Sequence, residues 1–320
     1  MMNALTELLT TRTVPVFNAS MAGAAGPDLA SAVSGGGGVG MLGVPSAPDL
    51  DGLTSAAERL QRERAVWGAG FLSFALDADI TPLQRVLDHE PSVVALGFGH
   101  SDAAVTAVRK SPAVLLAQVG NIAELESAID AGVDGIIVRG AEAGGHGRNE
   151  ISTLTFLQIA VERTSIPLLA AGGITTARGL AAVIAGGAIA AWVGTRFTVA
   201  SESQFPDAAK QRVLDARDGD TVYTRVFDIA QRAAWPPHYG GRALSNSFSD
   251  TWHGREHELE TTVRSSPSMA DDMLSARREG RFDVGPIYSG EGSALVTRVE
   301  SAEAILADLG RYRDYLHAAR

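Results

Sequence analysis

Eight short apolar runs, each followed by a stretch with helical character, succeed one another through about the first 200 residues of this 320-residue chain. The apolar runs occupy residues 14–17, 38–42, 65–72, 93–96, 114–117, 134–138, 167–170 and 190–193. Strands that are apolar almost throughout and alternate with helices are typical of parallel sheets covered by helices. Eight such units in roughly 200 residues predict an α/β fold of the (β/α)8 type, a TIM barrel. A doubly wound open sheet is the alternative architecture.

Local signals place helices between these runs. Pro82 suits the first turn of a helix, because its missing N–H would have no intrahelical partner there. Asn121 suits the N-cap of a helix that reaches about residue 131. The glycine-rich stretch 35–40 precedes an apolar run and does not open a helix after one. It is therefore a poor match to a dinucleotide-binding fingerprint.

The character of the chain changes after about residue 200. Residues 215–282 carry more charge, two of the four tryptophans and clusters of turn-forming Ser, Asn and Asp. Helices are expected near residues 256–264 and 269–278. We therefore expect three parts: a barrel over residues 1–214, an inserted and mostly helical substrate or lid domain over 215–285, and a C-terminal segment over 286–320 that returns to the barrel.

The composition excludes several classes of protein. The formal net charge of −10 leaves no basic stripe to neutralise nucleic-acid phosphates. The absence of cysteine excludes disulfides, thiolate metal sites and cysteine nucleophiles. Residues 1–12 lack a sustained apolar segment, and the most apolar stretch, 179–193, is too short to span a bilayer. We expect a cytoplasmic protein with a small-molecule substrate, and neither nucleic acid nor a membrane as a partner.

A glycine-rich loop over residues 140–148 follows the sixth apolar run and contains a single histidine, His146. At the carboxyl end of a barrel strand, such a loop lies at the mouth where catalytic groups are placed. Imidazole titrates near neutral pH and is therefore a suitable acid or base. Because His146 has almost no side chains beside it in the sequence, we expect it to face a ligand. The alternative is that it only caps a turn or the next helix.

Two glycine turns follow the seventh and eighth apolar runs. The first contains Gly172 and Gly173, and the second contains Val193, Gly194 and Thr195. Barrels commonly bind phosphate between these two loops through backbone N–H groups, and glycine lets the backbone approach closely. The pattern predicts a phosphate site. The alternative is that the glycines only make tight turns.

Three further places are weaker candidates. The loop 18–23 leaves the first apolar run at the same mouth, where its small residues would suit a planar ring or simply close the barrel. His100 follows the fourth run and could face the mouth. His253 and His257 have the i, i+4 spacing of a metal site on a helix. Without a third ligand or a thiolate, a solvated helix face is favoured, and we predict no metal.

Three of these segments together resemble the nitronate monooxygenase (2-nitropropane dioxygenase) family: residues 138–147, 170–174 and 194–197. Residues 15–21 and 289–292 fit the family more loosely, and the resemblance spans nearly the whole chain. It implies an FMN-binding (β/α)8 barrel with an inserted substrate domain. Relatives of the same architecture include NADH:quinone reductases and flavin-dependent enoyl-acyl-carrier-protein reductases.

The resemblance also implies roles for residues of this chain. The FMN phosphate would lie on the two glycine turns, at Gly172, Gly173, Gly194 and Thr195, with Val193 in the same turn. Met21 would contribute backbone near the flavin ring, and Gly144 would pack against the cofactor. His146 would lie beside the flavin and act as a base toward a nitroalkane, which makes chemical sense for a group poised near neutral pH.

Three positions depart from the family's pattern. The family commonly has Gln where this chain has Arg139, Asn where it has Gly70 and Pro where it has Ser20, and the two amides normally help to hold the flavin. Arg139 brings a fixed positive charge to a position that is usually neutral. Facing the ring, it would favour anionic reduced flavin; facing outwards, it could recognise an anionic substrate.

We therefore expect an FMN-dependent oxidoreductase that oxidises alkyl nitronates or nitroalkanes with O2 by flavin electron transfer. One alternative is an NAD(P)H-dependent quinone or enoyl reductase on the same FMN barrel. Another is a flavin-free sugar-phosphate lyase or isomerase, which usually needs a lysine or paired carboxylates at the strand ends. A third is a flavin-binding protein whose catalysis has lapsed. A homodimer is compatible with all of these.

Overall fold

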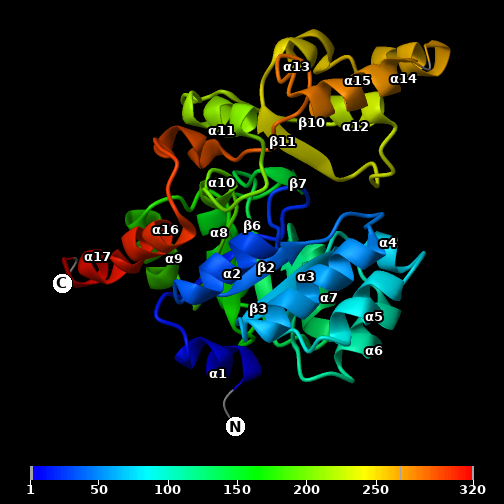
Figure 1. The fold of residues 1–320 in the computed structure, drawn as a ribbon. Helices are drawn as coiled ribbons and strands as arrows, with labels where there is room; N and C mark the ends of the chain where they lie inside the picture. Colours follow the sequence, from blue (N-terminus) through cyan, green and yellow to red (C-terminus); the bar gives the residue numbers. More distant parts are fainter. Residues whose placement is uncertain (1–2, 267, 319–320) are drawn as a thin grey trace.

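The computed structural model describes residues 3–266 and 268–318, and eight of its strands form a parallel barrel (Figure 1). These strands are β1 (Val16–Asn18), β2 (Gly40–Gly43), β3 (Trp67–Leu72), β4 (Val93–Gly97), β5 (Val114–Val119), β6 (Gly135–Arg139), β8 (Leu168–Ala171) and β9 (Ala190–Val193). They pair in the order β1-β9-β8-β6-β5-β4-β3-β2, and a parallel bridge from Phe17 to Val39 joins the two ends. The predicted barrel is confirmed, since each strand overlaps one predicted apolar run.

Alternate residues of each strand belong to two different cores, as the period of two in a strand requires. Phe17, Leu116 and Leu169 pack together in the barrel interior, where Phe17 also stacks on Trp192 with 5.7 Å between ring centroids. The intervening residues, such as Val16, pack outwards against the helices. Burial on both faces explains why these strands are nearly continuous apolar runs in the sequence.

Helices cover the outside of the barrel. They are α2 (Pro27–Gly35), α3 (Leu50–Arg62), α4 (Ser73–Leu76), α5 (Thr81–Leu87), α6 (Asp102–Val108), α7 (Ile122–Asp130), α8 (Thr153–Val161), α9 (Ala177–Ala185) and the short α10 (Thr195–Thr198). As predicted, Pro82 lies in the first turn of α5, and the Asn121 side chain caps α7 by accepting from the Glu124 N–H at 3.0 Å.

An unpredicted helix, α1 (Ala4–Thr10), closes the amino end of the barrel (Figure 1). Leu5 is completely buried among the interior residues, and Asn3 Nδ2 donates to the Asp134 carbonyl at 3.0 Å. With this end filled, the opposite mouth, where the carboxyl ends of the strands lie, is the end available for a site.

The segment that follows the barrel lies at that opposite mouth (Figure 1). It contains α11 (Asp207–Leu214), β10 (Thr221–Thr224), α12 (Val226–Gln231), β11 (Gly240–Leu244), α13 (Ser247–Trp252), α14 (Glu256–Ser265) and α15 (Ser268–Glu279). The predicted helices near 256–264 and 269–278 correspond to α14 and α15. The strands were not predicted. They form a three-stranded antiparallel sheet, β10-β11-β7, whose edge strand β7 (Gly145–Gly147) belongs to the loop after β6.

The C-terminal segment passes through the 3-10 helix η1 (Glu291–Leu295) and returns to the barrel as α16 (Ala302–Gly310) and α17 (Tyr312–Ala318). Helix α16 packs against α2 and α9, and α17 packs against α9. The C-terminal segment therefore ends in two consecutive helices. Within residues 3–266 and 268–318, no helix has the length and apolar character needed to cross a membrane.

Candidate active site

A cavity of about 710 Å³ lies at the carboxyl ends of the barrel strands, a volume within the usual range for small-molecule sites. Its wall combines strand ends with residues of the inserted segment. Nine of the ten predicted site residues line it: Met21, Gly70, Arg139, Gly144, His146, Gly172, Gly173, Gly194 and Thr195. The tenth, Val193, is buried among the residues that pack outwards from the barrel.

The two glycine turns form one wall of this cavity. Gly172 and Gly173 have φ values of +117° and +68°, a region that favours glycine. A Cβ at Gly172 would lie 2.5 Å from Thr153 Oγ1, whereas one at Gly173 would meet nothing closer than 3.9 Å. The backbone at Gly172 therefore lies close to Thr153, the first residue of α8, whereas the space beside Gly173 is open.

The second glycine turn, which contains Gly194 and Thr195, leads directly into helix α10. Gly194 is the N-cap of this helix, and no side chain caps it, so the first N–H groups of the helix are left without an intrahelical partner. Thr195 Oγ1 accepts from the Gly290 N–H at 2.9 Å, which holds the tail segment against the turn. Nearby, Thr175 Oγ1 is buried without a hydrogen-bond partner among the described residues. These donors suit a phosphate group.

Ser20 and Gly70, two of the three positions that depart from the family's pattern, lie side by side. A Cβ at Gly70 would lie 2.3 Å from Ser20 Oγ and 2.4 Å from Ser20 Cβ, so the serine side chain fills the space beside the glycine. Ser20 Oγ is itself buried with no hydrogen-bond partner among the described residues. A larger side chain at position 70 would require residue 20 to move.

His146 is surrounded by side chains, contrary to the expectation of a bare loop. It lies in β7, opposite Gly241 of β11. Its Nε2 is 2.8 Å from Oδ1 of Asp228 in α12, and its ring stacks on Trp235 with 3.7 Å between centroids and 6° between planes. The sequence could not show these neighbours, because Asp228 is 82 residues away and the inserted segment brings it there.

Tyr288 completes this cluster. Its hydroxyl donates to Asp228 Oδ1 at 3.3 Å, and its ring centroid is 4.9 Å from that of His146. Burial, and then the negative charge of Asp228, raise the pKa of Tyr288 well above its ordinary value. The phenol therefore keeps its proton at neutral pH and remains a donor to the carboxylate.

Arg139 lines the cavity and also has a structural role that neither expectation from the sequence included. Its Nη2 donates to the carbonyls of Ala143, Gly144 and Gly145 at 3.0, 3.1 and 2.9 Å, so the guanidinium holds the loop that leads to His146. A Cβ at Gly147 would lie 1.9 Å from Arg139 Nη1, which explains the glycine there. Burial lowers the pKa of Arg139 to about 10, so it stays charged at neutral pH.

Replacing Arg139 with methionine should lower the free energy of unfolding by about 3 kcal/mol, because three carbonyls beside the cavity lose their charged donor. Urea denaturation measures this change. The control is Arg59→Met, because Arg59 forms surface ion pairs with Asp28 and Glu63 and is 40% exposed; it should change stability by less than about 1 kcal/mol. Equal effects of the two substitutions would show that Arg139 does not hold the loop.

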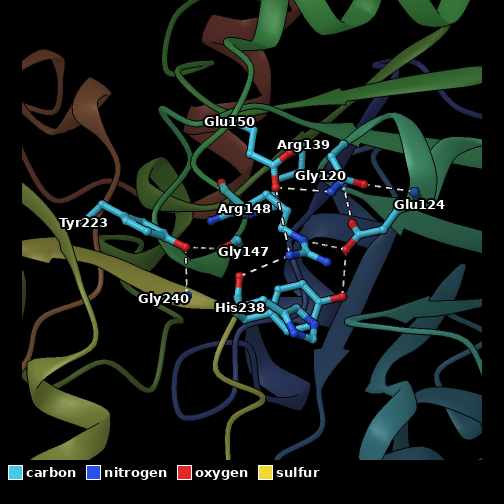
Figure 2. A network of polar contacts seen from close by, with 11 residues as sticks. Gly120, Glu124, Arg139, Gly147, Arg148, Glu150, Tyr223, His238 and Gly240 are labelled. Atoms are coloured by element: carbon cyan, nitrogen blue, oxygen red, sulfur yellow. Dashed lines mark hydrogen bonds and ion pairs between the residues drawn. The ribbon is translucent and has the colours of Figure 1, made fainter.

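A polar network fixes the other side of this loop (Figure 2). Glu124 of α7 accepts from Arg148 Nε and from the Tyr239 hydroxyl, both at 2.8 Å. Tyr223 of β10 donates to the Gly147 carbonyl, also at 2.8 Å. The loop that carries His146 is therefore bonded to the barrel through Arg148 and Glu124 and to the inserted segment through Tyr223, while Tyr239 bonds the inserted segment to Glu124. Glu142, in the same loop, accepts from the Thr153 N–H and hydroxyl.

The three other histidines considered from the sequence, His100, His253 and His257, lie outside the cavity. His100 is 41% exposed and its Nε2 contacts Asp102 Oδ1 at 2.9 Å. His253 and His257 are exposed on the inserted segment. Within the described ranges, no three His, Asp or Glu side chains are grouped in a way that could hold a metal ion.

Comparisons with known proteins agree on the family. The family model described as nitronate monooxygenase matches residues 50–311. The chain is 31% identical over 329 residues to nitronate monooxygenase npaC of Metarhizium robertsii, covering 93% of this chain and 90% of that protein.

Two solved structures are similar over nearly their whole length. FabK from Thermotoga maritima has a TM-score of 0.83 at 27% identity, covering 100% of this chain and 99% of that one. Nitroalkane oxidase from Streptomyces ansochromogenes has a TM-score of 0.83 at 25% identity, covering 98% and 99%. The chain is an oxidoreductase enzyme, and it belongs to the nitronate monooxygenase family.

Proposed function

We propose that this chain is an FMN-dependent oxidoreductase that oxidises alkyl nitronates or nitroalkanes with O2. The observation that carries the proposal is one cavity lined both by His146, which is bonded to Asp228, and by the glycine cradle, that is, the two turns at Gly172–Gly173 and Gly194–Thr195. The relatives whose names specify nitronate monooxygenase and nitroalkane oxidase support this substrate class.

The residues of the cavity fit FMN. Gly172, Gly173, Gly194 and Thr195 would hold its phosphate, since open backbone N–H groups favour an anion at this position. Met21, Gly70 and Gly144 line the same cavity and would lie against the ring. When bound, FMN would supply the electron transfer between the nitronate and O2.

His146 would remove the proton α to the nitro group of a neutral nitroalkane, or hold the nitro oxygens of a nitronate that arrives already deprotonated. Trp235 covers one face of the imidazole and is held by edge contacts with Phe74 and Phe98, at 5.2 and 5.0 Å between centroids. This aromatic cover would exclude water from the base.

We also propose that residues 215–285 act as the substrate domain. Asp228, Trp235 and Arg277 of this segment line the cavity beside the barrel residues. An NAD(P)H-dependent reductase on the same barrel is the second candidate, because the similarity to FabK extends over the whole chain. A flavin-free lyase or isomerase is disfavoured, because none of the residues that line the cavity is a lysine.

Equilibrium binding of FMN and riboflavin to the purified protein, after bound flavin is removed, tests the cofactor proposal. Because riboflavin lacks the phosphate, FMN should bind about 100-fold more tightly, which corresponds to about 2.7 kcal/mol. Flavin fluorescence quenching measures both constants. Equal affinities would refute the binding of phosphate at the glycine cradle, and no binding of FMN would refute the proposed cofactor.

A further inference from the structure

We infer that Asp228 is a positioning residue that fixes His146 as the tautomer with its proton on Nε2, so that Nδ1 is the atom that exchanges a proton with the substrate. This inference rests on the proposed function for its reaction. The tautomer itself is a property of the protein alone and can be measured without turnover.

The tautomer follows from the chemistry of the contact. An ionised carboxylate only accepts hydrogen bonds, so the imidazole nitrogen that faces Asp228 Oδ1 at 2.8 Å must carry a proton. A neutral imidazole has one proton, and its other nitrogen is then an acceptor. Nδ1 of His146 has no hydrogen-bond partner among the described residues, and His146 lines the cavity. The open nitrogen is therefore the one suited to act as a base.

The packing around the ring holds this orientation. The side chains of His146 and Asp228 are 10% and 5% exposed, so water competes little for their contact. Trp235 lies parallel to the imidazole, which restricts its tilt. Tyr288 donates to the same carboxylate oxygen and so holds Asp228 in place. Turning the ring over would place carbon Cε1 where Nε2 lies, so the buried carboxylate would lose the imidazole donor and keep only Tyr288.

Charge adds a second effect. When Nδ1 takes up a proton, the imidazole becomes a cation, and the adjacent carboxylate stabilises it, as the acid does in hydrolases with a Ser-His-Asp triad. Arg277 is a further charged group near this cluster, and its charge opposes the rise in the pKa of Tyr288 that burial and Asp228 cause. Asp228 should therefore matter most for a substrate that must lose a proton, and little for one that arrives as the anion.

The inserted segment thus contributes residues that orient His146 as well as residues that line the cavity. Asp228 and Trp235 both belong to it, and β11 of the same segment pairs with β7, which carries His146. The glycine turns belong to barrel loops, whereas the contacts that orient the imidazole come from this segment. Substitutions in the two places should therefore affect different steps, FMN binding and proton transfer.

The first test is the ¹⁵N spectrum of histidine-labelled protein at about pH 8, above the ordinary titration range of imidazole. His146→Gln identifies the signals of His146. The expected result is protonated Nε2 and unprotonated Nδ1. In Asp228→Asn, the amide can donate to Nε2, and a second population with the proton on Nδ1 should appear. Asp250→Asn, an exposed position in α13, is the matched control and should leave the spectrum unchanged.

A proton on Nδ1 in the natural protein would overturn the inference, and so would an Asp228→Asn spectrum identical to it. The second test compares substrates. Asp228→Asn should lower kcat about 100-fold with a neutral nitroalkane and less than about 3-fold with its preformed nitronate. Equal losses with both substrates would mean that Asp228 only supports the fold. If neither substrate is oxidised by the natural protein, the proposed function fails, while the spectrum still decides the tautomer.

Discussion

Replacing His146 with glutamine is expected to lower kcat with a neutral nitroalkane by about 10²–10⁴-fold, while the affinity for FMN stays within about 3-fold. Glutamine retains an N–H donor that can reach Asp228, so the buried carboxylate keeps a partner. It has no group that takes up a proton near neutral pH. The glycine cradle lies on different loops and is not altered.

Steady-state oxygen consumption with a nitroalkane measures the first effect, and flavin fluorescence measures the second. His100→Gln is the matched control, because His100 is 41% exposed and lies outside the cavity. It should leave kcat unchanged within about 2-fold. Turnover of the nitroalkane by His146→Gln at the natural rate would show that His146 is not the base. A loss of bound FMN in this variant would instead place His146 among the residues that hold the cofactor.

Replacing Gly194 with leucine is expected to weaken FMN binding by at least about 100-fold, or about 2.7 kcal/mol. A Cβ at this position meets only Met21 Sδ at 3.6 Å and Ala19 Cβ at 3.7 Å, which are ordinary contacts, so the backbone tolerates a side chain. Because Gly194 lines the cavity, the rest of the leucine would occupy the space in which the phosphate is proposed to lie.

Gly35→Ala is the control for this substitution. Gly35 is exposed at the end of α2, and a Cβ there would meet nothing within 4 Å. It should leave FMN affinity unchanged and keep or slightly raise the stability of the apoprotein. If Gly194→Leu binds FMN as the natural protein does, the phosphate lies elsewhere. Thermal unfolding without FMN separates lost binding from lost folding.

The barrel could be predicted from the sequence because its signals are local. Strands such as β4 and β6 are buried on both faces, so each is a short, continuous apolar run. The helix starts at Pro82 and Asn121 also depend on adjacent residues only. The carboxyl ends of parallel strands must meet at one mouth, so the glycine turns could be assigned to a common cavity before the structure was known.

The glycine-turn pattern did not distinguish residues whose side chains face the cavity from residues whose side chains face the outer core, as Val193 shows. Successive residues of a strand point to opposite faces, and here Trp192 and Gly194 line the cavity while Val193 faces the outer core. The period of two in β9 predicts this direction of the Val193 side chain, so a contact of Val193 with the cofactor would have to come from its backbone.

The surroundings of His146 could not be predicted, because they depend on pairing between distant segments. Strands β7 and β11 contain glycines that favour no strand on their own, and they become strands because they pair with each other. Asp228 and Trp235 reach the histidine only through that pairing. The orientation of Arg139 is likewise decided by carbonyls of a loop whose course the sequence does not specify.

In the proposed reaction, FMN in this cavity receives electrons from a nitronate. Anaerobic titration of the FMN-loaded protein tests it most directly, with an alkyl nitronate, NADH and NADPH added separately while the flavin absorbance is recorded. We predict that the nitronate reduces the flavin and that admitting O2 restores the oxidised spectrum. Reduction by NADH or NADPH, together with an unchanged spectrum in the presence of the nitronate, would contradict the claim and identify the protein as a reductase.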